Sequence, residues 1–205
     1  MINIYNMDCM ISLKEMENNA FDLAIVDPPY GLPKTAIHGR GQLKNRALNR
    51  GSGKMSQWDI VPNQEYFWEL MRVSKNQIIW GGNHFPLPPT RGIICWDKCQ
   101  PWDNFSQVEL AWTSFDMPAK IYRFDNRTRD KIHPTQKPVA LYTWLLSRFA
   151  KKGDRILDTH LGSGSISIAC HNLGFSLEAF EVDPDYYAAA LNRLDKHQNQ
   201  YQLWR

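Results

Sequence analysis

Short hydrophobic runs recur along the chain and predict the strands of a buried sheet. The runs are almost continuously apolar, which is typical of strands that are covered by helices on both faces. Two neighbouring runs, 92–98 and 108–114, are separated by a polar, aromatic loop and favour an antiparallel pair. The expected strands are 2–5, 21–26, 77–83, 92–98, 108–114, 154–158 and 176–183.

Apolar residues at helical spacing lie between most of these runs and predict helices. The expected helices are 9–17, 62–74, 133–153, 164–174 and 184–197. Strands that alternate with helices predict an α/β fold. We therefore expect a three-layer sandwich around a mostly parallel, seven-stranded sheet with one antiparallel strand near an edge.

Segment 32–57 interrupts this alternation, because it is rich in Gly, Asn, Lys and Arg and has no hydrophobic period. Between Lys34 and Lys54 the chain has six Lys or Arg residues and no Asp or Glu. Such a block suits a phosphate backbone, although a solvated polar loop is the alternative. Connections of this length are usually functional or mobile.

Composition predicts one compact domain over residues 1–205. The chain is 43% hydrophobic and its net charge is only +3, so the location of the basic residues is more informative than their total. The four cysteines form no CxxC pair, and we expect neither a metal site nor disulfides. Without a signal peptide or an apolar run of membrane-spanning length, the protein is expected to be cytoplasmic.

Candidate chemistry follows several strands directly, where α/β sheets bind ligands. The turn "DTHLGSGS" (158–165) follows one strand and would let a ligand lie against bare backbone. Glu181 ends the next strand, 17 residues after Gly164, at a spacing suited to ribose hydroxyls. The third glycine of a dinucleotide site is missing, which disfavours a dehydrogenase and favours a nucleoside without a phosphate bridge.

The stretch Asp27-Pro28-Pro29-Tyr30 follows the 21–26 strand and offers hydrogen-bond acceptors beside an aromatic ring. Proline has no backbone N–H, so the turn presents a carboxylate and carbonyl oxygens. This set suits a planar ligand with an exocyclic amine, whose two hydrogens would go to Asp27 and the Pro28 carbonyl. Its ring would stack on Tyr30.

The DPPY stretch together with the D-x-x-x-G-x-G turn resembles the amino-group DNA methyltransferases that use S-adenosylmethionine. The order, with the catalytic turn before the glycine turn, resembles their β class. The resemblance implies a Rossmann-like, circularly permuted fold and a double-stranded DNA substrate from which the target base is flipped out. It also implies dimers, which β-class enzymes often form. The sequence departs from the family where Thr159 and His160 replace the usual Pro-Phe.

The resemblance also implies roles for individual residues. The catalytic residues are Asp27, Pro28, Pro29 and Tyr30. The cofactor-binding residues are Asp8, Cys9, Asp27, His133, Thr135, Lys137, Asp158, Leu161, Gly162, Ser163, Gly164, Glu181 and Val182. The basic charges, rather than the resemblance, make candidates for DNA contacts of Lys34, Arg40, Lys44, Arg46, Arg50, Lys54, Arg127 and Arg129. The last two lie within a short candidate recognition region at 113–132, where the family often holds its target-recognition part.

The leading hypothesis is transfer to the N6 amine of adenine, because DPPY is the form most associated with that target. Cytosine N4 stays open, since both amines fit the same acceptors. An RNA or protein-glutamine methyltransferase is a further alternative. A catalytically silent nucleic-acid-binding protein is the alternative from another class.

Overall fold

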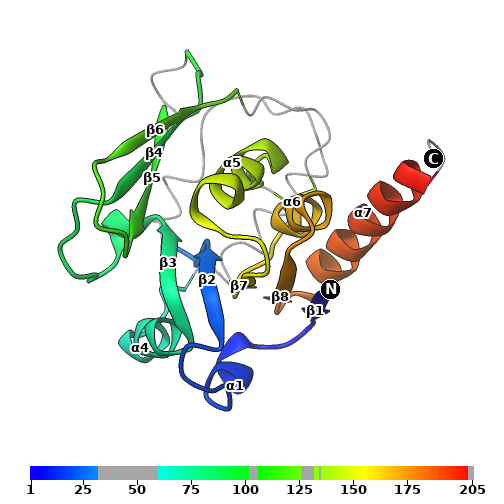
Figure 1. Ribbon diagram of the computed structural model, residues 1–205, viewed down its shortest axis with the longest axis horizontal. Helices are drawn as coiled ribbons and strands as arrows, with labels where there is room; N and C mark the ends of the chain where they lie inside the picture. Colours follow the sequence, from blue (N-terminus) through cyan, green and yellow to red (C-terminus); the bar gives the residue numbers. More distant parts are fainter. Residues whose placement is uncertain (32–59, 102–105, 126–131, 134, 203–205) are drawn as a thin grey trace.

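The structure is a computed structural model that describes residues 1–31, 60–101, 106–125, 132–133 and 135–202. Its centre is one eight-stranded sheet (Figure 1). The strands are β1 (Ile2–Tyr5), β2 (Phe21–Val26), β3 (Ser74–Trp80), β4 (Ile93–Asp97), β5 (Val108–Thr113), β6 (Lys120–Arg123), β7 (Arg155–Asp158) and β8 (Ser176–Phe180).

The strand order is β1-β8-β7-β2-β3-β5-β4-β6. Among the strands of the described residues, only β5 is antiparallel to its neighbours, β3 and β4. The mostly parallel sheet with one antiparallel strand is therefore confirmed. The first strand of the chain pairs with the last, with Tyr5 opposite Phe180, as a circular permutation requires. Since β7 lies between β8 and β2, the glycine turn and the DPPY turn leave adjacent strands.

The expected number of seven strands is wrong by one, because β6 extends the sheet beyond β4. Its four residues, KIYR, include two cations, and Ile121 is 63% exposed. A short edge strand needs no apolar run, since only one side of it pairs with a neighbour. The hydrophobic pattern therefore did not indicate it, and residues 120–123 of the candidate recognition region belong to the sheet.

Helices cover both faces of the sheet and complete the three layers (Figure 1). One core packs against α5, α6 and α7 and includes Leu145 and Ile166, and the other packs against α1 and α4 and includes Leu13 and Phe67. The helices are α1 (Cys9–Leu13), α4 (Gln64–Val73), α5 (Val139–Phe149), α6 (Ser165–Leu173) and α7 (Pro184–Gln202), with a 3-10 turn, η1 (Gly82–His84). No helix in the described part of the chain is long and apolar enough to cross a bilayer.

The helix expected over 133–153 begins six residues later, at Val139. Pro138 is its N-cap residue, with extended backbone at φ −71° and ψ 146°. A residue before proline is disfavoured in the helical region, so Lys137 does not join the helix. Outside the helix, Lys137 reaches the carboxyl ends of the strands, where it contacts Asp27.

Candidate active site

Four acidic residues follow or end neighbouring parallel strands and therefore lie along one edge of the sheet. Asp8 follows β1, Glu181 follows β8, Asp158 ends β7 and Asp27 follows β2. In α/β sheets this edge, at the carboxyl ends of the strands, holds ligands.

Asp27 has two partners on its two oxygens. The Tyr30 hydroxyl donates to Oδ1 at 2.6 Å, and the Lys137 ammonium donates to Oδ2 at 2.5 Å. Each carboxylate oxygen has two lone pairs, so Asp27 keeps acceptor capacity for a further donor. The sequence placed Lys137 near a cofactor, but the structure places its ammonium on the expected catalytic carboxylate.

The Lys137 side chain is only 2% exposed, so its charge depends on its partners. Burial disfavours the ammonium, but the carboxylates of Asp27 and Glu109 outweigh burial and raise the pKa of Lys137. The group is therefore a cation at neutral pH.

The ring of Tyr30 is held from one side by residues that the sequence did not single out. It stacks on His84, with ring centroids 5.0 Å apart, and meets Phe85 edge-on. Gly81 has φ +68°, and a Cβ there would lie 2.1 Å from the Tyr30 ring. Burial raises the pKa of Tyr30 well above its ordinary value, so its hydroxyl stays a donor to Asp27. Gly81, the first of the two glycines after Trp80, was the sequence signal for this contact.

The glycine turn is tied to β8 through Glu181. Glu181 Oε2 accepts the Gly162 N–H at 2.7 Å, and Oε1 accepts the Asp183 N–H at 2.9 Å. Gly162 and Gly164 both have positive φ, at 53° and 69°, a conformation that favours glycine. The turn thus presents backbone without side chains, and the carboxylate keeps lone pairs for hydroxyl donors.

His133 packs against this turn. A Cβ on Gly162 would lie 3.6 Å from its ring, and the Tyr186 ring meets it edge-on at 4.3 Å. His133 Nδ1 accepts the Thr135 N–H at 3.3 Å, which leaves the ring proton on Nε2. Burial lowers the pKa of His133 to about 4, so the imidazole is neutral.

The aspartates after β1 and at the end of β7 accept hydrogen bonds from nearby backbone N–H groups. Asp8 caps α1 by accepting the Met10 N–H at 2.9 Å, and Asp158 accepts the His160 N–H at 3.0 Å. Burial raises the pKa of Asp158 to about 8. His160 Nδ1 lies 2.9 Å from the Thr159 hydroxyl.

The other expected cofactor residues lie on the same turns. Burial raises the pKa of the Cys9 thiol to about 12, so it is not a thiolate. Leu161 is buried and its N–H donates to the Phe180 carbonyl. The Ser163 carbonyl accepts from Arg193 at 2.8 Å, and Val182 is 60% exposed. The residues expected to contact DNA, Lys34, Arg40, Lys44, Arg46, Arg50, Lys54, Arg127 and Arg129, lie outside the described residues.

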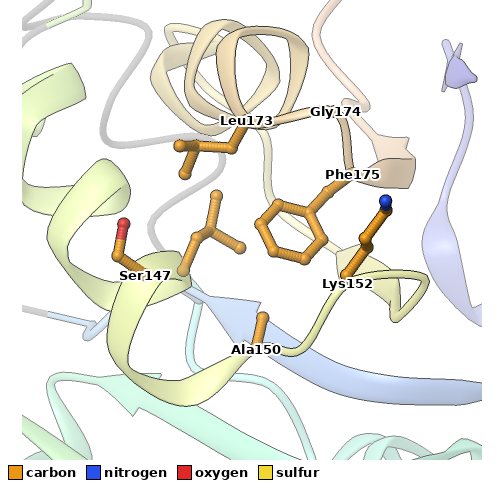
Figure 2. Close-up of a pocket in the computed structure, with 7 residues that line it drawn as sticks. Ser147, Ala150, Lys152, Leu173, Gly174 and Phe175 are labelled. Carbon is orange, nitrogen blue, oxygen red and sulfur yellow. The ribbon is translucent and has the colours of Figure 1, made fainter.

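A hollow of about 380 Å³ lies near the amino ends of the parallel strands, beside the C-terminal ends of α5 and α6 (Figure 2). Its walls include Leu146, Leu173 and Phe175, with Ser147 and Lys152 as polar members. These side chains offer no acid–base pair, so the chemistry-bearing groups lie at the other edge.

Comparison with known proteins identifies the family of the chain. The family model for DNA methylases of the N6/N4 type matches residues 96–192. The type II methyltransferase M.HpaI of Haemophilus parainfluenzae is 34% identical over an alignment that covers 92% of this chain and 72% of that protein. The chain belongs to the N6/N4 DNA methylase family.

Other relatives of this methylase extend the comparison. The type II methyltransferase M2.MboI of Moraxella bovis is 25% identical over 82% of the chain and 78% of that protein. The crystal structure of an M1.HpyAVI–SAM complex has a TM-score of 0.62 at 21% identity, covering 95% of the methylase and all of that chain. The PvuII DNA methyltransferase, which is cytosine-N4-specific, has a TM-score of 0.63 at 12% identity, covering 98% and 91%. At these identities the two structures show a shared fold.

Proposed function

We propose that this methylase transfers a methyl group from S-adenosylmethionine to the N6 amine of an adenine flipped out of double-stranded DNA. The observation that carries the proposal is the geometry of Asp27. Its carboxylate follows the strand next to the glycine turn, is held by Tyr30 and Lys137, and keeps free lone pairs for an amine.

The residues along this edge fit S-adenosylmethionine. The partly exposed Gly162 offers bare backbone, and Glu181 has acceptor capacity for ribose hydroxyls. Lys137 forms ion pairs with Asp27 and Glu109, so we infer that it positions the Asp27 carboxylate in addition to any contact with the cofactor. When bound, S-adenosylmethionine supplies an electrophilic methyl carbon on a sulfonium.

Asp27 and the Pro28 carbonyl would accept the two hydrogens of the target amine. The lone pair of an aromatic amine is delocalised into its ring, and acceptors on both N–H bonds localise it on nitrogen. As nitrogen forms its bond to the methyl carbon, Asp27 stabilises the positive charge that develops on nitrogen. The sulfur–carbon bond breaks in line with this attack, and the methylated ammonium then releases a proton. Alignment of the reactants supplies most of the rate gain.

Cytosine N4 is the second candidate, because its exocyclic amine fits the same two acceptors, Asp27 and the Pro28 carbonyl. Aspartate at the first position of the DPPY stretch supports adenine, because serine there is more associated with cytosine. DNA contacts by the basic residues of 32–57 and a recognition role for 113–132 stay predictions, and DNA-binding assays of Lys/Arg variants test them. A homodimer also stays a prediction, and sedimentation of the purified chain tests it.

The decisive experiment is methylation of unmodified DNA with labelled S-adenosylmethionine, followed by mass analysis of the nucleosides. We expect N6-methyladenine from the wild type, and a rate lower by roughly 10²–10³-fold for Asp27→Asn, because one preorganised acceptor is weakened. Asp22→Asn, on the same strand, is the matched control, since Asp22 pairs with the exposed Lys75 instead. Calorimetry with S-adenosylmethionine shows whether each variant still binds. Equal rates for Asp27→Asn and the wild type would contradict the mechanism, and N4-methylcytosine would establish the second candidate.

A further inference from the structure

The buried ammonium of Lys137 contacts a second carboxylate besides Asp27. Its Nζ lies 3.1 Å from Oε2 of Glu109, on β5. The other oxygen of Glu109 lies 2.6 Å from Nζ of Lys98, which follows β4. Four groups of alternating sign, Asp27, Lys137, Glu109 and Lys98, therefore form a continuous charge chain from the proposed catalytic carboxylate across three strands.

Two buried tryptophans line this charge chain. Lys137 Nζ lies 5.2 Å from the Trp80 ring centre, and Lys98 Nζ lies 5.6 Å from the Trp96 ring centre. The two rings meet edge-on at 6.3 Å and are at most 1% exposed. Cations favour the faces of aromatic rings, so the rings hold both ammonium groups in place.

Little water reaches the charges of this chain. The Lys137 side chain is 2% exposed, and those of Asp27, Glu109 and Lys98 are 16%, 24% and 22% exposed. Burial disfavours ionised Glu109, but Lys137 and Lys98 outweigh it and lower the pKa of Glu109 to about 2. Glu109 and Lys137 are thus both charged at neutral pH, and each charge acts strongly on its neighbours in this poorly hydrated setting.

We propose that Glu109 and Lys98 are positioning residues, which set how tightly Lys137 holds Asp27 and so how well Asp27 accepts the target amine. The proposal rests on the proposed methyl transfer. Lys137 is shared by two carboxylates, through a hydrogen bond to Asp27 and an ion pair with Glu109. Glu109 in turn is shared by the two ammonium groups of Lys137 and Lys98. Without the charge of Glu109, Lys137 interacts with Asp27 alone, and that interaction becomes stronger. Without Lys98, Glu109 attracts Lys137 more strongly, and the interaction of Lys137 with Asp27 becomes weaker.

The alternation predicts opposite effects for neighbouring substitutions. Glu109→Gln tightens the hold of Lys137 on Asp27, and we expect single-turnover methyl transfer to slow by at least about tenfold. Lys98→Met loosens that hold and should raise the same rate about two- to fivefold. In both variants the affinity for S-adenosylmethionine, measured by calorimetry, should stay within about threefold of the wild type, because neither Glu109 nor Lys98 is among the residues expected to bind the cofactor. Glu65→Gln, which breaks the exposed ion pair with Lys14, is the matched control.

A charge chain that only stabilises the fold would behave differently. Both substitutions would then lower the rate together, in proportion to a lower melting temperature, and that result would overturn the proposal. An unchanged rate in Glu109→Gln beside an active wild type would overturn it as well.

A second measurement does not depend on activity. Burial protects the Lys137 ammonium from exchange, so its side-chain nitrogen should give a distinct NMR signal. We expect this signal to shift in Asp27→Asn and in Glu109→Gln, and to stay in place in Glu65→Gln. If the wild type methylates no DNA, the proposed function fails, and the signal still decides whether Lys137 joins the two carboxylates. A shift in Asp27→Asn without one in Glu109→Gln would refute the coupling.

Discussion

Asp27 accepts hydrogen bonds from a neutral donor, Tyr30, and a charged donor, Lys137. The two donors differ in their distance from Asp27 along the chain. Tyr30 is three residues away and belongs to the same turn, whereas Lys137 lies 110 residues later. The DPPY stretch predicted Asp27 and Tyr30 as members of one site. It did not predict that the Tyr30 hydroxyl bonds to Asp27, because the residue pattern does not determine where a phenol points.

Tyr30→Phe separates the two contributions of this residue. The variant keeps the ring on His84 and loses the 2.6 Å hydrogen bond to Asp27. A hydrogen bond to a charged group contributes about 1.5–3 kcal/mol. Its loss leaves Asp27 to the Lys137 ammonium alone, so we expect methyl transfer to slow by roughly 10- to 100-fold. Tyr30→Ala also removes the ring and should slow it further. Single-turnover kinetics measure both, and a Tyr30→Phe rate equal to the wild type would show that the hydroxyl does not position Asp27.

Among the elements, the ends of strands and helices decide the site more than their interiors do. β3 ends at Trp80, and Gly81 then turns the backbone under the Tyr30 ring. The extended residues before α5 bring Lys137 to Asp27. The expected helix over 133–153 obscured this, because a proline near its start is typical of the first turn, whereas Pro138 is the N-cap residue before the helix.

Gly81→Ala tests the close approach of backbone and ring. Gly174 is the matched control, because it has nearly the same backbone, with φ +75° against +68°, and no atom within 4 Å of an added Cβ. Both variants carry the cost of a left-handed alanine, about 1–2 kcal/mol. Gly81→Ala also displaces Tyr30, so we expect a larger loss of unfolding free energy in urea and a loss of activity that Gly174→Ala lacks. Equal losses in the two variants would contradict the contact.

For the whole molecule, burial at the candidate site makes stability depend on pH. Burial lowers the pKa of both His133 and His160 to about 4. Unfolded histidine titrates near pH 6.5, so between about pH 4 and 6.5 the unfolded chain binds more protons at these sites, and stability rises with pH. Asp158 opposes this, since burial raises its pKa to about 8 and the folded state holds its proton.

Among these three groups, two imidazoles outnumber one carboxyl below about pH 6.5, whereas only Asp158 of the three still titrates above it. We therefore expect the free energy of unfolding to rise to a maximum near pH 6.5 and to fall toward pH 8. Urea denaturation from pH 4 to 9 measures it. Asp158→Asn should abolish the fall above pH 6.5, and a wild-type stability that keeps rising to pH 8 would contradict the assignment.

By itself the sequence determined the α/β class, most of the strands, and the turns that carry Asp27, Gly162–Gly164 and Glu181. These are local properties, since apolar runs, prolines and glycines act on the backbone next to them. Only the tertiary structure decided that β6 joins the sheet and that Lys137, Glu109 and Lys98 link to Asp27. Those contacts join residues far apart in the chain, and their energies come from burial and from charges that meet only in the folded protein.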